Sequence, residues 1–460
     1  MDSTGIIGGQ EVALEGLADR LETFCLNSIR QALPDAVIEQ ECAKAKWKYR
    51  RRLITPVAAA LHMIMAALWP EQSFAAAWHL QWCYAKSLRG SGKDKSPSMA
   101  SVAKARARVP LRAWEGIFAW LCAEAQRISK PLDSWRGHRL IIADGTTLTT
   151  ADRPELFEEF GRGAGRGGQY KYPLVRVVVM GLANTMTLIG CRIGGYRQGE
   201  WSLLYGLLDL LGAGDILIAD RAFAGAHHYA AYMGRGVGFV TRVHQAIGVE
   251  KLGVLWRAGT RGFVTRLKVN GVYRRRDKQL PEWVKVRLIA VRLKVRGKWK
   301  DTWLVTSLLD AQAYPEEEIL ELYARRWRVE TMLREVKVAM GSDVLRSVTA
   351  EGVKKEILAR LSAATIVRTL MVEAAIAKGE DPLRLSFSFA VRAVLGYAPA
   401  FARLPLWMLP EKYDEMLEEM AGHKVPWRPG RQEPRAARLE KKHYPTLRST
   451  RAQWRLENAA

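Results

Sequence analysis

Hydrophobic residues first recur at helical spacing and then change, near residue 139, to short uninterrupted runs. Up to about residue 130, Ala, Leu, Met and Trp repeat about every 3.6 residues in segments such as LADRLETFCLNSIRQAL and PVAAALHMIMAALW, which prolines separate. We therefore expect an N-terminal part made of helices. One of them follows Ser98, a suitable N-cap, and ends near Arg108.

Two of the apolar runs end in an aspartate. RLIIAD ends at Asp144, and DILIAD ends at Asp220. Between them, LVRVVVMGL and TLIGCRIGGYR predict a hairpin, and residues 201 to 211 predict a short amphipathic helix. Strand, hairpin, helix, strand is the opening order of an RNase H-like fold, in which the first and fourth strands are parallel neighbours. That order would bring the two carboxylates together, although an isolated aspartate at a strand end is often only a turn residue.

A long stretch of chain separates Asp220 from Glu330, an acidic residue of a later segment that is described below. The stretch is longer than one strand and one connection need. After a strand in GFVTRV, the segments VKVRL and VRLKVR alternate apolar and basic residues. This alternation predicts strands with one face toward a core and the other presenting Lys and Arg. We therefore expect a β subdomain inserted over about residues 248 to 302, after which WLVTSL, from Trp303, returns the chain to the main sheet.

Two other features have less specific interpretations. GRGAGRGG contains a GxGxxG spacing, but no strand precedes it and no helix follows. A dinucleotide site is therefore excluded, and a flexible basic loop that approaches phosphate is expected. His227 and His228 are adjacent and would point to different sides of a helix, so we expect surface residues rather than metal ligands.

The charge of the chain indicates its class of partner. The 460 residues include 71 Lys and Arg against 47 Asp and Glu, which gives a net charge of +24. We expect a polyanionic partner, with nucleic acid the first choice and an anionic membrane surface the second. From Lys424 onward the sequence is rich in Arg, Pro and Lys, which predicts an extended basic arm over DNA phosphates or a solubilising tail.

A membrane protein is not expected. The longest apolar run, residues 57 to 69, includes a histidine and is too short to span a bilayer. The first residues lack the basic start and apolar block of a signal peptide, so a cytoplasmic protein associated with the nucleoid is expected. The five cysteines are odd in number and well separated, which predicts buried thiols rather than disulfides or a zinc site.

Candidate chemistry gathers in ELYARRWRVETMLREVKVAM, residues 321 to 340. The segment lacks Pro and Gly and is expected to form one helix. On that helix Tyr323, Arg326, Glu330 and Lys337 would share a stripe roughly 60° wide. A carboxylate beside a phenol and two cations suits a metal-binding acid next to phosphates. The alternative is a solvent-exposed helix face on which Glu330 pairs with a neighbouring arginine.

The spacing of these four residues resembles the YREK signature of the insertion-sequence-four family of DDE transposases. Asp144 and Asp220, each at the end of a strand, would supply the two aspartates that such an enzyme also requires. The resemblance covers most of the chain. It implies an α/β fold with an RNase H-like catalytic core and an inserted β subdomain, preceded by an α-helical N-terminal domain and followed by helices and a basic tail.

The resemblance also implies a metal site. Asp144, Asp220 and Glu330 would be the catalytic residues and would hold two Mg²⁺ ions about 4 Å apart, which Mn²⁺ would be able to replace. One ion would activate the attacking water or 3′-hydroxyl, and the other would stabilise the leaving oxygen.

Further residues are expected to contact DNA. Arg326 and Lys337 would bind phosphates next to the scissile bond, Tyr323 would position the strand, and Arg221 follows the second aspartate directly. By its place in the motif order, Trp303 would receive a base flipped out of the element end, although a tryptophan in a strand is usually part of the core.

The basic end of the helix after Ser98 has two interpretations. Lys104, Arg106 and Arg108 would contact DNA if the segment is the second helix of a helix-turn-helix. Alternatively, they only complement the dipole of their own helix. The segment resembles part of the N-terminal helical domain that precedes the catalytic core in the same family.

The domain boundaries expected from these patterns can be stated in order along the chain. They are a helical N-terminal DNA-binding domain at 1–130, a first part of the core at 131–247, the β insertion at 248–302, a second part of the core at 303–375, C-terminal helices at 376–423 and the basic tail at 424–460.

The expected function is DNA transposition. The resemblance implies cleavage at terminal inverted repeats of double-stranded DNA and joining to target DNA, by cut-and-paste through a hairpin intermediate within a homodimer. Two rival interpretations remain: a metal-dependent nuclease of the same fold without strand transfer, and a domesticated DNA-binding protein that has lost catalysis.

Overall fold

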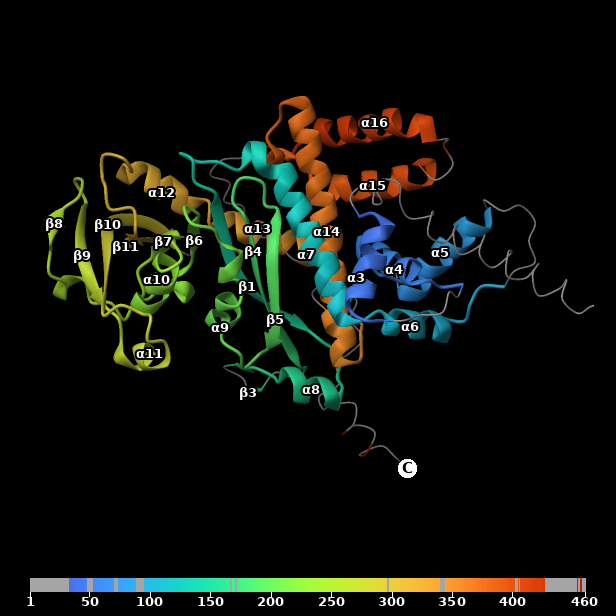
Figure 1. Cartoon of the computed structure of the whole chain (residues 1–460), viewed down its shortest axis with the longest axis horizontal. Helices are drawn as coiled ribbons and strands as arrows, with labels where there is room; N and C mark the ends of the chain where they lie inside the picture. Colours follow the sequence, from blue (N-terminus) through green and yellow to red (C-terminus); the bar gives the residue numbers. More distant parts are fainter. Residues whose placement is uncertain are drawn as a thin grey trace, which may run out of the picture.

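The computed structural model shows an elongated molecule with a sheet toward one end and helices toward the other (Figure 1). The residues that it describes are 33–47, 53–69, 73–87, 95–165, 168–169, 172–295, 298–339, 344–401, 404, 406–426, 453 and 456. Element labels below are those of Figure 1.

The helices expected before residue 130 are present from residue 35 onward. Ser98 caps α6 as predicted, because its side chain accepts a hydrogen bond from the Ser101 N–H at 3.2 Å. Thr55 caps α4 in the same way, at 3.1 Å from the Ala58 N–H. The bounds are α3 (Asp35–Lys44), α4 (Pro56–Leu68), α5 (Phe74–Ser87), α6 (Met99–Arg108) and α7 (Leu111–Ser129).

Within the described residues, nine strands form one mixed sheet in the order β5-β4-β1-β6-β7-β11-β10-β9-β8. β1 and β6 are parallel neighbours, as the order of the apolar runs predicted, and β6 and β7 are also parallel. β4 and β5 form the predicted hairpin beside β1. The bounds are β1 (Leu140–Thr149), β4 (Leu174–Leu182), β5 (Leu188–Gly195), β6 (Ile216–Ala219), β7 (Gly238–Arg242), β8 (Trp256–Arg257), β9 (Gly262–Lys268), β10 (Trp283–Val295) and β11 (Lys298–Thr306).

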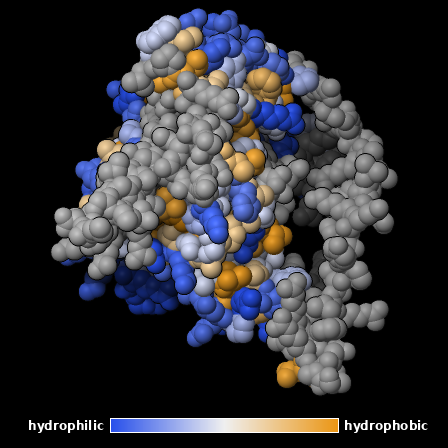
Figure 2. Space-filling model, turned by 90° about the vertical axis from the view of Figure 1, so that its right-hand side faces the viewer, coloured by the Kyte–Doolittle hydropathy of each residue, from blue (hydrophilic) through white to orange (hydrophobic). Residues whose placement is uncertain are grey.

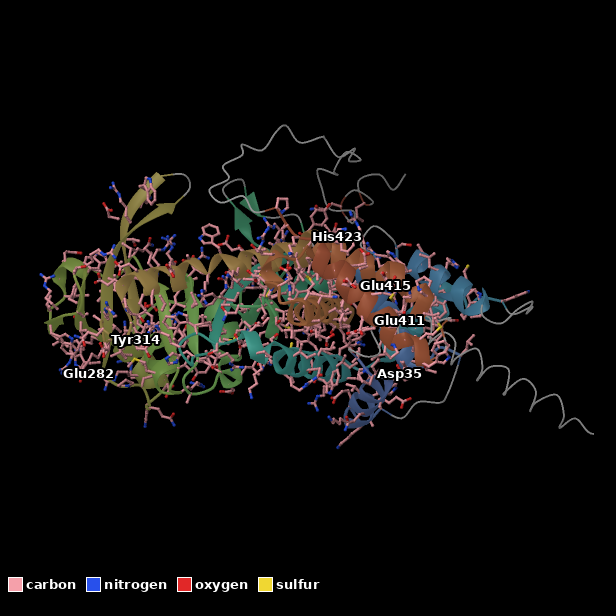
Figure 3. The ribbon with its side chains drawn as sticks, turned by 90° about the horizontal axis from the view of Figure 1, so that it is seen from above. Asp35, Glu282, Tyr314, Glu411, Glu415 and His423 are labelled. Carbon is pink, nitrogen blue, oxygen red and sulfur yellow. The ribbon has the colours of Figure 1, made fainter. Side chains whose placement is uncertain are left out.

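The strands that follow β7 in sequence extend this same sheet. β11 pairs antiparallel with β7, and β10, β9 and β8 follow outward. The sequence predicted strands in this region, but they are hydrogen-bonded into the main sheet rather than forming a sheet of their own. Figure 3 shows the β10–β11 hairpin projecting from the rest of the molecule.

Helices cover both faces of the sheet because alternate strand residues are apolar on each side. Ile141 and Ala143 pack with α9 and α10, whereas Leu140 and Ile142 pack in a larger core with α13 and α14. The remaining bounds are α8 (Pro154–Phe160), α9 (Glu200–Tyr205), α10 (Ala226–Met233), α11 (Gly271–Arg276), α12 (Glu316–Ala324), α13 (Trp327–Arg334), α14 (Ala350–Lys378), α15 (Phe387–Phe401) and α16 (Leu409–Gly422).

The N-terminal and C-terminal helices share the larger core. Ile38 of α3, Met63 of α4 and Trp114 of α7 belong to the same buried cluster as Val367 of α14 and Ile142 of the sheet. Figure 3 shows Asp35 and His423 toward one end of the molecule and Glu282 toward the other. On the face in Figure 2, hydrophobic residues of the described surface lie in small groups between hydrophilic ones.

Arg287 departs from the expected pattern of exposed basic residues on β10. Its side chain is 0% exposed, and its Nη1 donates a hydrogen bond to the Tyr314 carbonyl oxygen at 2.7 Å. The Glu316 carboxylate at the start of α12 lies 3.8 Å from Arg287 Nη2. The prediction that basic residues of this strand face solvent is therefore wrong at Arg287, because α12 covers that part of the sheet, whereas it is right at Lys285.

His227 and His228 are packed against aromatic rings, so the prediction of surface residues is wrong. His228 is 6% exposed and stacks on Trp201 with ring centroids 3.6 Å apart, and His227 stacks on Tyr273 at the same separation. Burial lowers the pKa of His227 to about 4 and that of His228 to about 3. Both imidazoles are therefore neutral near pH 7 and act as packing groups between α9, α10 and α11.

Several smaller expectations have mixed outcomes. The Gly-rich segment forms a short hairpin of β2 (Ala164–Gly165) and β3 (Gly168–Gln169) rather than a plain loop. Cys42 and Cys122 are buried as predicted, but Cys83 is exposed. Cys25 and most of the basic tail lie outside the described residues. None of the described helices combines the length and hydrophobicity that crossing a bilayer requires.

Arg287→Met should lower the free energy of unfolding by about 1–3 kcal/mol, because it removes the buried hydrogen bond to the Tyr314 carbonyl oxygen and one of the two cations beside the buried Glu316 carboxylate, the other being Arg261. Lys285→Met on the same strand is the matched control, since Lys285 is exposed and its loss should change stability by less than about 0.5 kcal/mol. Urea denaturation measures both. Equal effects of the two substitutions would contradict the packing described for α12.

Candidate active site

Three neighbouring parallel strands carry charged residues that point to one side of the sheet. Asp220 directly follows β6, as predicted, but β1 continues past Asp144 to Thr149, so the prediction that Asp144 ends its strand is wrong. Pairing of residues 144–149 with β4 extends β1 beyond its apolar run. The register of β1, β6 and β7 brings Asp144, Asp220 and Arg242 into one row, with neighbours about 4.8 Å apart. Ile142 and Ile218 face the core that contains α13, so by alternation the two aspartates also face α13. Arg242 Nη2 donates a hydrogen bond to Asp220 Oδ1 at 3.1 Å.

The segment expected to form one helix is broken into three pieces. α12 ends at Ala324, α13 begins at Trp327, and the chain widens into a π-helical turn over Glu335–Ala339. Sequence reasoning missed the break, because helix propensity alone gives no reason for it.

The break lies where two arginines bind the turn between β4 and β5. Arg325 Nη1 donates to Asn184 Oδ1 at 2.8 Å, and Arg328 Nη1 donates to the Ala183 carbonyl oxygen at 2.7 Å. These bonds hold the end of α12 and the start of α13 against the sheet, so tertiary contacts override the local preference for a continuous helix.

The four residues of the predicted stripe consequently have different environments. Tyr323 is 6% exposed and Arg326 is 8% exposed, so both are buried. The Glu330 side chain is 40% exposed. Lys337 lies in the π turn, where its Nζ is 3.3 Å from the Thr147 carbonyl oxygen of β1.

Arg326 lies among the acidic residues. Its Nη1 donates to Glu330 Oε1 at 2.8 Å, and its charge lowers the pKa of Asp144. Burial alone would lower the pKa of Arg326, but the neighbouring Tyr323, Glu330 and Asp220 together raise it. The three predicted acids therefore lie close to one buried guanidinium, whose Nε has no hydrogen-bond partner among the described residues.

The carboxylates themselves are not gathered into a metal-binding cluster. Over the described ranges, no group of three or more His, Cys, Asp and Glu side chains is positioned to hold a metal ion. Glu330 instead pairs with Arg326, and Asp220 pairs with Arg242. The ion pair between Glu330 and a neighbouring arginine, which the sequence offered as the alternative, is thus present, although the arginine is buried rather than solvent-exposed.

Asp144 has a carboxyl group whose pKa is shifted by its surroundings. Burial raises its pKa from 3.8 to about 6, and the Gly145 N–H, which donates to Oδ1 at 2.8 Å, opposes this shift together with Arg326. Glu200 and Glu330 raise the pKa further. Such a shift in a recessed acid beside other charges is typical of functional sites.

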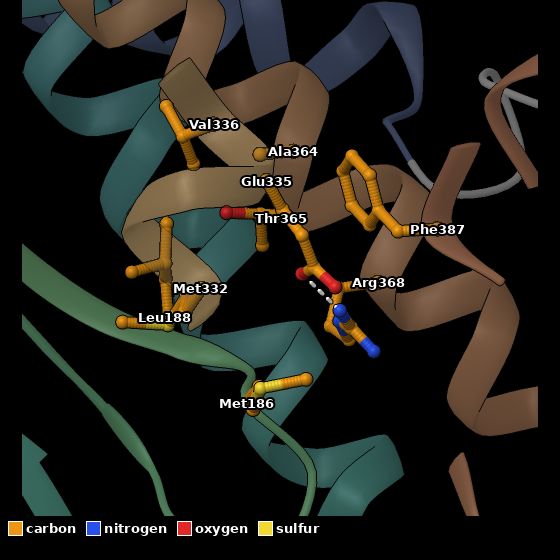
Figure 4. Close-up of a pocket in the computed structure, with 9 residues that line it drawn as sticks. All are labelled: Met186, Leu188, Met332, Glu335, Val336, Ala364, Thr365, Arg368 and Phe387. Carbon is orange, nitrogen blue, oxygen red and sulfur yellow. Dashed lines mark hydrogen bonds and ion pairs between the residues drawn. The ribbon is translucent and has the colours of Figure 1, made fainter. Parts of the chain in front are cut away.

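A buried ion pair between Glu335 and Arg368 fixes the π-helical turn that carries Lys337. Glu335 accepts a hydrogen bond from Arg368 Nη2 of α14, and the Arg368 guanidinium lies over the Phe387 ring at 5.4 Å. Figure 4 shows this pair in a small pocket that Met332 and Val336 also line. The pair ties the turn to α14 and so fixes where Lys337 meets β1.

The other predicted DNA contacts differ in exposure. Arg221, Lys104 and Arg108 are exposed. Arg106 is turned inward over the Phe74 ring at 3.9 Å, so its side chain is part of the packing between α5 and α6. This position does not support a direct contact with DNA by Arg106.

Trp303 is half-buried in β11. Its ring meets Phe263 edge-on with centroids 5.6 Å apart, and it packs against the core on the α10 side of the sheet. The observed position fits the ordinary role of a strand tryptophan, and part of the ring remains accessible.

Sequence reasoning missed Arg242 and the Glu335–Arg368 pair. Arg242 follows the apolar run of GFVTR, so the strand-end rule applied to Asp144 and Asp220 would also have selected it. Glu335 and Arg368 are far apart in sequence, and no local pattern connects them.

Comparison with known proteins supplies the family. The family described as "Transposase DDE domain" matches residues 135–366, which is half of the chain and includes the row of charged residues, α12, α13 and the first part of α14. The chain belongs to the DDE transposase family. This membership confirms the resemblance found in the sequence and makes the protein a DNA transposase, an enzyme that cleaves DNA and transfers strands.

Two relatives of this DDE transposase come from Escherichia coli (strain K12). "Transposase InsG for insertion sequence element IS4" is 27% identical over 364 residues, covering 78% of this chain and 80% of the relative. "Putative transposase InsZ" is 30% identical over 127 residues, covering 27% of this chain and 42% of the relative.

Among solved structures, a piggyBac transposase synaptic complex with hairpin DNA aligns with 88% of this DDE transposase and 86% of its own chain. The sequence identity is 13% and the TM-score is 0.45, a value too low to establish a shared fold.

Asp144→Asn should stabilise this transposase in a pH-dependent way in the presence of a chelator. Between about pH 4 and 6 the folded protein keeps a proton on Asp144 that the unfolded chain has lost, so the free energy of unfolding falls as pH rises through this window. Asn cannot ionise, so the gain should be near zero at pH 4 and about 1–3 kcal/mol at pH 7. Urea denaturation at several pH values measures it.

Asp301→Asn is the control, because the Asp301 side chain is 85% exposed on β11. Its effect should stay within about 0.5 kcal/mol at every pH. A gain from Asp144→Asn that does not change with pH would contradict the burial of this carboxyl group.

Proposed function

We propose that Asp144, Asp220 and Glu330 form the catalytic metal site of this transposase. The observation that carries the proposal is the parallel register of β1 and β6, which aligns two aspartates on the face that α13 and Glu330 also occupy. Membership of the DDE family implies the use of divalent metal ions. Our proposal specifies these three residues and two Mg²⁺ ions, with Mn²⁺ as a substitute.

The donor set fits such ions. Carboxylate oxygens are the ligands that Mg²⁺ prefers, and the three acids already share the field of one buried cation, Arg326. A divalent ion would take over the neutralising role that Arg326 and Arg242 have toward Glu330 and Asp220. Bound ions would activate the attacking oxygen and stabilise the leaving oxygen.

The arginines would then be available for DNA. Within the part of the chain that the structure describes, the buried Nε of Arg326 has no acceptor, and a phosphate oxygen at that point would satisfy it. Arg242 and Lys337 lie on strands and turns next to the acids, so we propose that they hold the phosphates on either side of the scissile bond. Tyr323, buried beside Arg326, would position the backbone of the strand.

For the fold, we propose an RNase H-like core. The order β5-β4-β1-β6-β7 with β1, β6 and β7 parallel supports it, and β8 to β11 would be the family's insertion, here continuous with the sheet. We keep the domain boundaries expected from the sequence as part of this proposal, with the qualification that the helices before residue 130 share a core with α14.

The reaction that we propose starts with a nick at each end of a mobile element and finishes with joining of the 3′-hydroxyl to target DNA. Terminal inverted repeats and target DNA would be the substrates, and two copies of the chain would bring the ends together in the cytosol. A hairpin intermediate is part of the proposal, with Trp303 as the residue that receives a flipped base. Lys104, Arg108 and Arg221, all exposed, would add phosphate contacts.

Glu330→Gln should lower both end cleavage and strand transfer by at least about 100-fold, equivalent to about 2.7 kcal/mol in activation free energy, while DNA binding is retained. Incubation of a pre-cut element end with supercoiled target DNA measures joining directly. Glu321→Gln, at an exposed position of α12, is the control and should behave as wild type.

Two outcomes of that assay would overturn the proposal. Cleavage by the wild-type protein without any joined product would favour a nuclease that lacks strand transfer. Unchanged cleavage by Glu330→Gln would favour a DNA-binding protein whose acids are not catalytic.

Trp303→Ala should slow hairpin formation by about tenfold or more and leave the first nick almost unchanged, because only hairpin formation requires a stacked flipped base. Trp303→Phe should restore most of the rate. Trp299→Ala, on the same strand at a side chain that is 62% exposed, is the matched control. Equal slowing of nicking and of hairpin formation would show that Trp303 is only a core residue and does not receive a flipped base.

A further inference from the structure

The outer strands of the sheet present an open face that α12 does not cover. Next to β11, α12 covers this face, and its Glu316 carboxylate lies 3.8 Å from Arg287 Nη2. Farther out, Lys285 pairs in register with Arg266, and Trp283 pairs with Lys268. Alternation places the following residues of the three strands on that same face: Trp256, Arg266, Lys268, Trp283 and Lys285.

Two tryptophans of this face are exposed to an unusual degree for large apolar rings. Trp256 is 45% exposed and Trp283 is 47% exposed. Each ring has a lysine ammonium beside it, with Lys285 Nζ 5.3 Å from the Trp256 ring and Lys268 Nζ 5.5 Å from the Trp283 ring. A flat aromatic surface next to a cation is suited to a base and its phosphate.

The charge of the face favours an anion. Arg266, Lys268 and Lys285 are basic and exposed, whereas the Glu282 carboxylate at the rim lies 3.5 Å from Lys268 Nζ. These three positive charges exceed the one negative charge at the rim, and a phosphate chain would neutralise the surplus.

A hollow of about 530 Å³ adjoins Trp256. Its walls are the end of β8 and the loop before α12, including Gly259, Leu309 and Gln312. Asp310 also lines it, but its Oδ1 accepts hydrogen bonds from the backbone N–H groups of Gln312 and Ala313 at 2.8 and 3.1 Å. The hollow therefore offers room beside the Trp256 ring, and the Asp310 carboxylate at its wall is hydrogen-bonded to the backbone of its own loop.

We propose that this aromatic and basic face binds an unpaired DNA strand, whose bases stack on Trp256 and Trp283 while Arg266, Lys268 and Lys285 hold its phosphates. Stacking on a protein ring needs bases that are free of a duplex. This contact is distinct from the catalytic row, since five strand spacings of about 4.8 Å separate β8 from β6. By alternation it lies on the same face of the sheet as Asp220, with α12 between the two.

The test is a binding titration of the full chain with a fluorescent oligo(dT) of about 12 nucleotides, followed by fluorescence anisotropy in a chelator. Because no divalent ion is present, the result does not depend on the catalytic proposal. The double variant Trp256→Ala/Trp283→Ala should bind the single strand at least about tenfold more weakly than wild type. Binding of a duplex of the same length should change by less than about twofold.

Matched variants separate stacking from loss of structure. Trp299→Ala removes a tryptophan that is 62% exposed on the opposite face of β11 and should leave binding unchanged. Trp256→Phe/Trp283→Phe should retain most of the affinity, because the stacking rings remain. Wild-type affinity of the double alanine variant, an equal loss for duplex, or an equal loss from Trp299→Ala would each overturn the proposal.

Discussion

The parallel hydrogen-bond register of β1, β6 and β7 is the constraint on which the rest of the site depends. Adjacent strands are held about 4.8 Å apart, and a shift of one residue would turn each terminal side chain to the opposite face. In the observed register Asp144, Asp220 and Arg242 are neighbours on the face toward α13. Backbone hydrogen bonds, and not the charged groups themselves, keep like-charged carboxylates close to each other.

The helices that pack on this row of residues supply the positive charge that balances its carboxylates. The break between α12 and α13 places Arg326 among the acids, and the arginines on either side of it anchor the break to the β4–β5 turn. The π turn behind α13 is fixed in turn by Glu335 and Arg368. The site therefore combines rigid supports with ion pairs that, in the proposed reaction, a metal ion and a phosphate would replace. This arrangement is consistent with an enzyme whose carboxylates are protected by arginines until DNA is bound.

Local sequence patterns were sufficient for the strands that carry Asp144 and Asp220 and for the hairpin between them, but not for the end of β1, which continues past Asp144 to Thr149 because it pairs with β4. Asp144 and Asp220 could be selected because buried parallel strands carry their own signature of apolar runs followed by a polar residue. The continuous helix over residues 321 to 340 was wrong because Asn184 and Ala183, distant in sequence, bind its arginines. Arg287 and the two adjacent histidines were misplaced for the same reason, since what covers them comes from other parts of the chain.

The account depends most directly on where a divalent ion binds when DNA is present. Anomalous diffraction from manganese in a crystal of the chain with a cleaved element end would locate it. The account predicts manganese peaks with oxygens of Asp144, Asp220 and Glu330 within about 2–2.3 Å, and Arg326 moved from Glu330 onto a phosphate. Manganese bound elsewhere, with the Arg326–Glu330 pair intact beside the DNA, would contradict it.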